Sequence, residues 1–123
     1  MESTTIEQSY RLLEFGLSAD TADMQYQHFG HKFGFAKYPS VIPTDSKLQE
    51  KSIPSWSLSA LMDLLPNEIE VGVDKLCLKI DKYYSYWYVR YLDKNENGIG
   101  YCEQKLIDSV YNVICYLFEE KLI

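Results

Sequence analysis

The sequence lacks several features on which common functions depend. It has no apolar run near the roughly 20 residues that span a bilayer, and its first residues, MESTTIEQSY, include neither the basic nor the apolar region of a signal peptide. Lysine and arginine number 12 against 18 aspartates and glutamates, a formal net charge of −6. Because nucleic-acid affinity depends on phosphate neutralisation by cationic side chains, we do not expect nucleic-acid binding. We expect a cytoplasmic protein with no membrane segment.

The motifs of common enzymes and cofactor sites are also missing. The sequence contains no P-loop, no dinucleotide-binding fingerprint and no G-x-S-x-G nucleophile elbow. Its three cysteines, Cys77, Cys102 and Cys115, form no CxxC pair, and an odd count indicates reduced thiols better than a disulfide framework or a zinc site. We therefore expect no cofactor and no enzymatic activity.

What the sequence does contain is a globular composition rich in tyrosine. Hydrophobic residues make up 46% and aromatic residues 15%, with eleven tyrosines among them. A chain of 123 residues is long enough to bury its own core and has the size of one domain. We expect residues 1–123 to form a single domain.

The N-terminal half predicts two helices around a strand and a loop. Thr4 and Glu7 have capping-box spacing, and Gly16 is a typical helix end. The apolar positions that recur with helical spacing after this cap are Ile6, Tyr10, Leu13 and Leu17. Residues 24–38 predict a strand that turns at Gly30 or Gly34, and the proline-rich segment 39–54 predicts an irregular connection. Ser55 is the expected N-cap of a second helix that Pro66 ends.

The C-terminal half predicts a sheet followed by a helix. KLCLKID (75–81) alternates apolar and polar residues, YYSYWYVRYLD (83–93) predicts a second strand, and IGYCE (99–103) predicts a third. LIDSVYNVICYLFEEKLI (106–123) has one apolar stripe, with Cys115 on its outer side. The expected fold is α+β, an antiparallel sheet with about three helices and the C-terminal helix packed on the sheet.

Alternation divides the tyrosine-rich strand into two faces. Trp87 and Val89 form the better core face, which leaves a candidate interaction ladder of Tyr84, Tyr86, Tyr88 and Arg90. Plain sheet packing explains such a ladder most simply, since tyrosine favours strands. A protein-binding or self-association face is the next alternative because tyrosine anchors many interfaces, and stacking of bases or sugars is the third.

Two further groups of residues are candidate metal sites. DKNENGIGYCEQ (93–104) nearly matches a calcium loop, with Asp93, Asn95 and Asn97 at ligand positions, but Gln104 stands where a bidentate glutamate is required. A hairpin turn is the preferred interpretation. His28 and His31 follow two aspartates, but H-x-x-H on a strand does not bring both rings to one side, so structural histidines are preferred over a metal or dispersed catalytic site.

Three blocks of the chain resemble a group of small uncharacterised proteins of phages and prophages in gut Bacteroides-type bacteria. The blocks are TIEQSYRLLEFGL followed by TADM, IPSWSLSALMDLLP, and the terminal ICYLFEEKLI. The resemblance implies an accessory protein of a mobile element and implies no activity, cofactor or catalytic residue. Our hypothesis is a non-enzymatic protein that acts through protein contacts, with an unknown partner or a second copy of itself. The alternative is a small-ligand or calcium module at the 93–104 loop.

Overall fold

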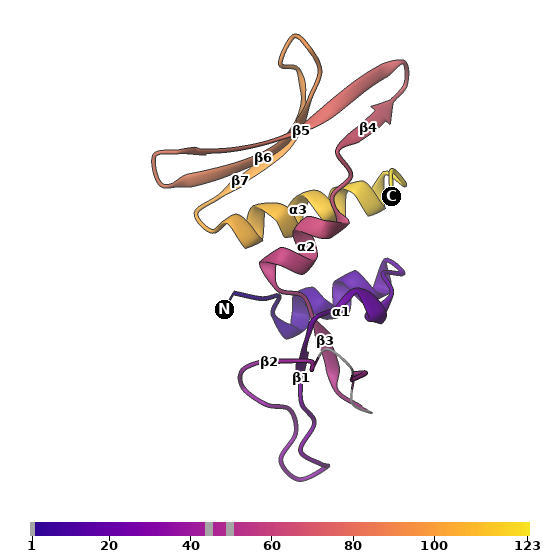
Figure 1. The fold of residues 1–123 in the computed structure, drawn as a ribbon, viewed down its shortest axis with the longest axis vertical. Coiled ribbons are helices and arrows are strands. Elements are labelled where there is room, and N and C mark those ends of the chain that lie inside the picture. The colour runs from indigo at the N-terminus through magenta and orange to yellow at the C-terminus, as the bar shows by residue number, and fades with distance from the viewer. Residues whose placement is uncertain (1, 44–45, 49–50) are drawn as a thin grey trace. The chain divides into compact units, whose positions relative to one another are not determined.

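The computed structural model describes residues 2–43, 46–48 and 51–123, and the chain divides into two compact units, residues 1–60 and 61–123 (Figure 1). The α-helices are α1 Ile6–Glu14, α2 Leu58–Leu64 and α3 Leu106–Glu119, with a 3-10 turn, η1, at Ala19–Thr21. The strands are β1 Met24–Tyr26, β2 Ser40–Val41, β3 Ile53–Ser55, β4 Glu68–Val71, β5 Asp74–Tyr83, β6 Tyr86–Leu92 and β7 Gly98–Glu103. The predicted α+β class, with the C-terminal helix against a sheet, is confirmed.

The first unit is a small antiparallel sheet with α1 packed on it. The strand order is β2-β1-β3, and α1 contacts β3. Leu12 on α1, Ile53 on β3 and Trp56 just beyond β3 are buried. The indole Nε1 of Trp56 donates to Thr21 Oγ1 at 2.9 Å, so the one polar atom of this large buried side chain has a hydrogen-bond partner.

The predicted cap of α1 is wrong by one residue. Thr5 is the N-cap, and its hydroxyl accepts from the backbone N–H of Gln8 while the side chain of Gln8 accepts from the N–H of Thr5. Thr4 instead lies in the core, where its Oγ1 accepts from the backbone N–H of Trp56 at 3.0 Å. On this helix Leu12 is buried, whereas Tyr10, which helical spacing predicted for the apolar face, is exposed.

The proline-rich segment contributes more structure than predicted. Within 39–54, where residues 44–45 and 49–50 lie outside the described part of the chain, the structure has β2 and most of β3. Ser55 lies in β3 and does not cap α2, so that prediction is wrong. Ser57 takes this role, because its Oγ accepts from the N–H of Ala60 at 3.2 Å.

The second unit is a four-stranded antiparallel sheet in the order β4-β5-β6-β7, with α3 packed against β6 and β7. The sequence did not predict β4, which pairs with β5 through a turn at Gly72, whose φ is 64°. The core residues at this interface are Val89, Tyr91, Val110, Val113, Ile114 and Leu117. Cys115 is also buried, so its predicted place on the outer side of the helix is wrong.

Candidate functional site

The two faces of β6 have different surroundings. Val89 and Tyr91 are fully buried on the side of α3, where Ser109 Oγ on α3 donates to the carbonyl oxygen of Trp87 at 2.8 Å. Successive strand residues alternate between faces, so the other side of β6 points away from α3. That side carries Tyr86, Tyr88 and Arg90.

The predicted ladder is wrong at Tyr84. Tyr84 and Ser85 form the two-residue turn between β5 and β6, so Tyr83 pairs directly with Tyr86 and takes the place that alternation predicted for Tyr84. Tyr84 is 83% exposed and has a φ of 56°, in the left-handed region that tyrosine rarely adopts. The rings of Tyr83 and Tyr84 meet edge to face, with centroids 4.6 Å apart.

We name the side of the sheet opposite α3 the open face. Its residues, assigned from the strand register, are Glu68 and Glu70 on β4, Lys75, Cys77, Lys79, Asp81 and Tyr83 on β5, Tyr86, Tyr88, Arg90 and Leu92 on β6, and Gly98, Gly100 and Cys102 on β7. Tyr83 is 62% exposed and Tyr86 43% exposed, whereas Tyr88 is half-buried. Two tyrosine rings therefore present apolar area to solvent beside a partly covered third.

Arg90 is held in place on the open face by three neighbours. Its Nη2 donates to Asp81 Oδ2 at 2.7 Å, and its guanidinium carbon lies 5.6 Å from the centroid of the Tyr88 ring. Gly100 on β7 lies opposite, and any β-carbon there would collide with Cγ of Arg90. An arginine fixed in this way has already lost side-chain freedom that binding would otherwise remove.

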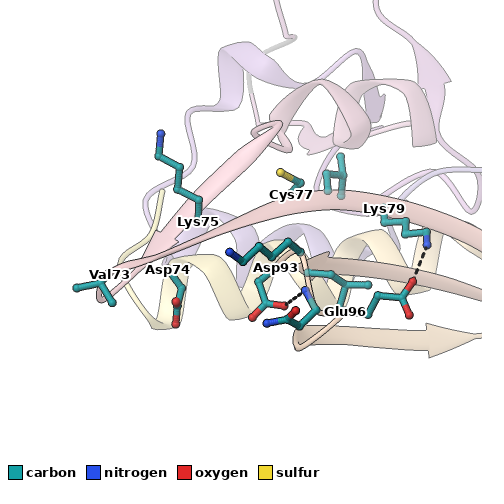
Figure 2. Close-up of a pocket in the computed structure, with 11 residues that line it drawn as sticks. Val73, Asp74, Lys75, Cys77, Lys79, Asp93 and Glu96 are labelled. Carbon is teal, nitrogen blue, oxygen red and sulfur yellow. Dashed lines mark hydrogen bonds and ion pairs between the residues drawn. The ribbon is translucent and has the colours of Figure 1, made fainter.

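A groove of about 860 Å³ lies at one end of the open face, between β5 and the turn after β6, and Cys77, Lys79 and Leu92 of that face line it (Figure 2). Lys79 Nζ and Glu96 Oε1 meet there at 3.8 Å, both largely exposed, so solvent screens this pair. The charged residues that line the groove are Asp74, Lys75, Lys79, Asp93, Lys94 and Glu96. Three acids offset three lysines, so the lining favours neither sign of ligand charge.

The predicted calcium loop is a tight turn that uses its first carboxylate internally. Asp93 Oδ1 accepts from the backbone N–H of Asn95 at 2.8 Å and of Asn97 at 3.0 Å. These are the side-chain-to-backbone bonds that favour Asp and Asn in turns. The flanking elements are β6 and β7, as the hairpin interpretation requires, and not the two helices of a calcium-binding hand.

The two histidines lie in a hairpin that follows β1. His28 Nδ1 accepts from the N–H of Gly30 at 3.2 Å, and its ring meets Phe35 edge to face at 4.9 Å, whereas His31 is exposed in the turn. Asp23 is bound to Ser57, through the backbone N–H at 2.9 Å and through the hydroxyl. Among the residues described by the structure, no three His, Cys, Asp or Glu side chains are grouped to hold a metal ion.

Sequence reasoning missed Tyr83, Asp81 and Gly100 of the open face. For Tyr83 the reason is the turn: Tyr-Ser contains none of the residues typical of a two-residue hairpin loop, so the strand was predicted to run through it. One signal was available in the sequence, because KLCLKIDKY and YWYVRYL both alternate between apolar and polar residues. The apolar residues of the core face have even numbers in the first run and odd numbers in the second. A change of parity between two alternating runs indicates an intervening turn.

Comparisons with protein-family models, curated proteins and solved structures found no match. No helix in the described part of the chain is long and apolar enough to cross a membrane.

Proposed function

We propose that this protein acts by binding another protein through the open face of its C-terminal sheet, without catalysing a reaction. The observation that carries the proposal is the two-sided sheet. Helix α3 covers one face (Figure 1), and on the opposite face Tyr83 and Tyr86 are exposed to solvent. Tyrosine and arginine are the residues most enriched where binding energy is concentrated in protein interfaces. We further propose that it works in the cytoplasm as an accessory protein of a phage or prophage.

Arg90 supports this assignment because it is fixed in position beside the tyrosines. Within the described part of the chain its Nε is buried without a hydrogen-bond partner, whereas 35% of the side chain stays exposed beside the ion pair with Asp81. A partner carboxylate or carbonyl group could accept hydrogen bonds from that part, while the tyrosine rings bury apolar area around it. The open face thus combines a charged hydrogen-bond donor, Arg90, with the apolar area of the neighbouring tyrosine rings.

The test compares the full chain with a variant of the open face, Tyr86→Ser with Arg90→Glu. Sedimentation velocity first determines whether the protein self-associates, and affinity capture from lysogenic cells then identifies other partners. The matched control is Tyr10→Ser with Arg11→Glu, which makes the same two changes on exposed positions of α1. We expect the open-face variant to weaken association at least 30-fold, from a hot-spot loss of about 2 kcal/mol. Equal association of the two variants would exclude the open face as the interface.

A second candidate function is the small-ligand or calcium site of the 93–104 loop, and the groove beside Asp93 and Glu96 favours it (Figure 2). Calorimetric titration with calcium chloride tests this candidate directly. Saturable heat with a dissociation constant tighter than about 1 mM, lost in Asp93→Asn, supports a site in the range of weak extracellular modules. If Asp93→Asn leaves the heat of calcium binding unchanged, the 93–104 loop is not the calcium site.

A further inference from the structure

The surface of the first unit contains a segment whose charge is opposite to that of the whole chain. No aspartate or glutamate occurs between Asp23 and Asp45, and this stretch contains Lys32, Lys37 and both histidines of the protein. We name residues 27–38 the aromatic hairpin. A net charge of −6 opposes general binding of polyanions, but the distribution of charge decides where a polyanion can approach. The aromatic hairpin is therefore a local basic patch on an acidic protein.

The same hairpin presents aromatic rings to solvent. Three of the five phenylalanines of the chain lie in it. Phe29 is 56% exposed, Phe33 75% and Tyr38 72%, while Phe35 is less exposed and contacts His28. Exposed apolar surface can mark an interaction site, so three exposed rings on one short hairpin make it a candidate binding surface.

Main-chain hydrogen bonds hold the backbone of the aromatic hairpin. Phe29 N–H donates to the carbonyl of Gly34 at 2.8 Å, Gly34 N–H donates to Gly30 at 2.9 Å, and Ala36 N–H donates to Gln27 at 2.8 Å. Gly30 and Gly34 have φ values of 99° and 68°, which glycine adopts readily. Main-chain bonds therefore form the turn, and the exposed rings of Phe29 and Phe33 remain available for a ligand.

We propose that the aromatic hairpin binds single-stranded nucleic acid. Its rings and cations are interleaved along the chain, with Phe29 after His28, Phe33 after Lys32 and Tyr38 after Lys37. The Nζ of Lys37 lies 5.4 Å from the centroid of the Tyr38 ring, so charge and ring form one unit. Single strands alternate flat bases with phosphates, and their binders combine stacking rings with basic side chains.

The chemistry of the hairpin differs from that of a protein interface. Interfaces are enriched in aromatic residues, methionine and arginine and depleted in lysine. The hairpin has aromatic rings but pairs them with lysine and histidine, and it contains no arginine.

Fluorescence anisotropy of the full chain with a labelled oligothymidylate or oligouridylate of about 15 nucleotides tests the proposal. We expect saturable binding at about 50 mM salt that weakens at about 200 mM. Phe33→Ala should weaken it roughly 5- to 150-fold through loss of stacking on one base. The double variant Lys32→Gln, Lys37→Gln should lower the slope of log affinity against log salt by about 1.4, from about 0.7 per phosphate contact.

The matched controls are Tyr84→Ala, an exposed ring of the second unit, and Lys94→Gln, an exposed lysine of that unit. Both should bind the oligonucleotide as the unaltered chain does. Circular dichroism of each variant establishes that the fold is retained. Absence of oligonucleotide binding at low salt overturns the proposal, as does binding that the controls reduce as much as the hairpin variants. If the chain binds no oligonucleotide but sediments with phosphatidylserine vesicles, the hairpin is assigned to membrane binding instead.

Discussion

Gly100 on β7 lies directly opposite Arg90 on β6, and the side chain of Arg90 occupies the space that a β-carbon at position 100 would require. The glycine is required by this contact and not by its backbone angles, because its φ is not positive. One residue on the edge strand thus determines how the arginine of the open face lies.

Replacement of either strand glycine by alanine should destabilise the second unit. Gly100→Ala must displace Arg90 and also approaches the carbonyl oxygen of Val89 at 2.8 Å, and we expect a loss of about 1–3 kcal/mol. Gly98→Ala should lose more, because its β-carbon would collide with the backbone carbonyl of Tyr91, which cannot rotate away. Urea unfolding measures both. Cys102→Ala on the same strand and face is the control, and a loss as large in the control would contradict the argument.

Tyr91→Phe should remove a partly buried hydrogen bond without leaving a cavity. The phenol donates to the carbonyl oxygen of Pro66 at 2.7 Å, and Tyr91 is fully buried. The variant leaves that carbonyl without its partner, which costs about 1–3 kcal/mol. Thermal or urea unfolding should show this loss. The exposed Tyr84→Phe is the matched change, and it should be neutral.

The stability of the protein should fall at alkaline pH, and Tyr91 should account for part of the fall. Burial raises the pKa of Tyr91 well above its usual value, and burial also raises the pKa of Tyr26. Below pH about 10 both phenols are neutral in the folded and unfolded chains, so stability is unaffected. Above it the unfolded chain releases protons that the folded chain retains, and each such group lowers stability by about 1.4 kcal/mol per pH unit. Urea unfolding of Tyr91→Phe across this range should show a shallower fall, and an identical slope would contradict the assignment.

The sequence predicted those parts of the fold that follow from periodicity over many residues. The apolar stripe from Leu106 to Phe118 predicted α3 and its packing on the sheet, and the alternation around Leu76 and Val89 predicted β5 and β6. These patterns are reliable because burial of one face selects the same residue type at every second or every third to fourth position. The α+β class followed from them.

The errors fall where a single residue decides the local geometry. Thr4 and Thr5 are both good caps, and the choice between them depends on the hydrogen bond from Trp56, which lies far away in sequence. Tyr84 has a low preference for the left-handed conformation it adopts, so turn propensity does not predict the turn, and only the change of parity between the two alternating runs indicates it. The short β2 and β3 strands depend on pairing with β1, which tertiary contact determines and local pattern does not.

Thr4→Val should test the buried network that displaced the predicted cap. Valine has nearly the same shape but cannot accept the N–H of Trp56 or reach the hydroxyl of Ser9, which lies 2.8 Å from Thr4 Oγ1. We expect a loss of about 1–3 kcal/mol from the unpaired backbone donor. Thr5→Ala, which removes the true N-cap, should cost about 1 kcal/mol. Chemical unfolding followed by tryptophan fluorescence compares the two, and a Thr4 variant that loses less than the Thr5 variant would contradict the burial argument.

Tyr84→Gly should stabilise the protein while removing an exposed aromatic ring. The φ of 56° at Tyr84 is unfavourable for a residue with a β-carbon by about 1–2 kcal/mol, and glycine adopts it freely. Glycine also gains freedom in the unfolded chain, which offsets part of the gain, so we expect a net stabilisation of about 0.5–1 kcal/mol. The matched change Tyr86→Gly, at a strand position paired with Tyr83, should instead destabilise by weakening the strand. Thermal unfolding of the two variants decides the matter: if Tyr84→Gly is destabilised as much as Tyr86→Gly, the ring of Tyr84 holds the hairpin together through its contact with Tyr83, and the turn is not strained.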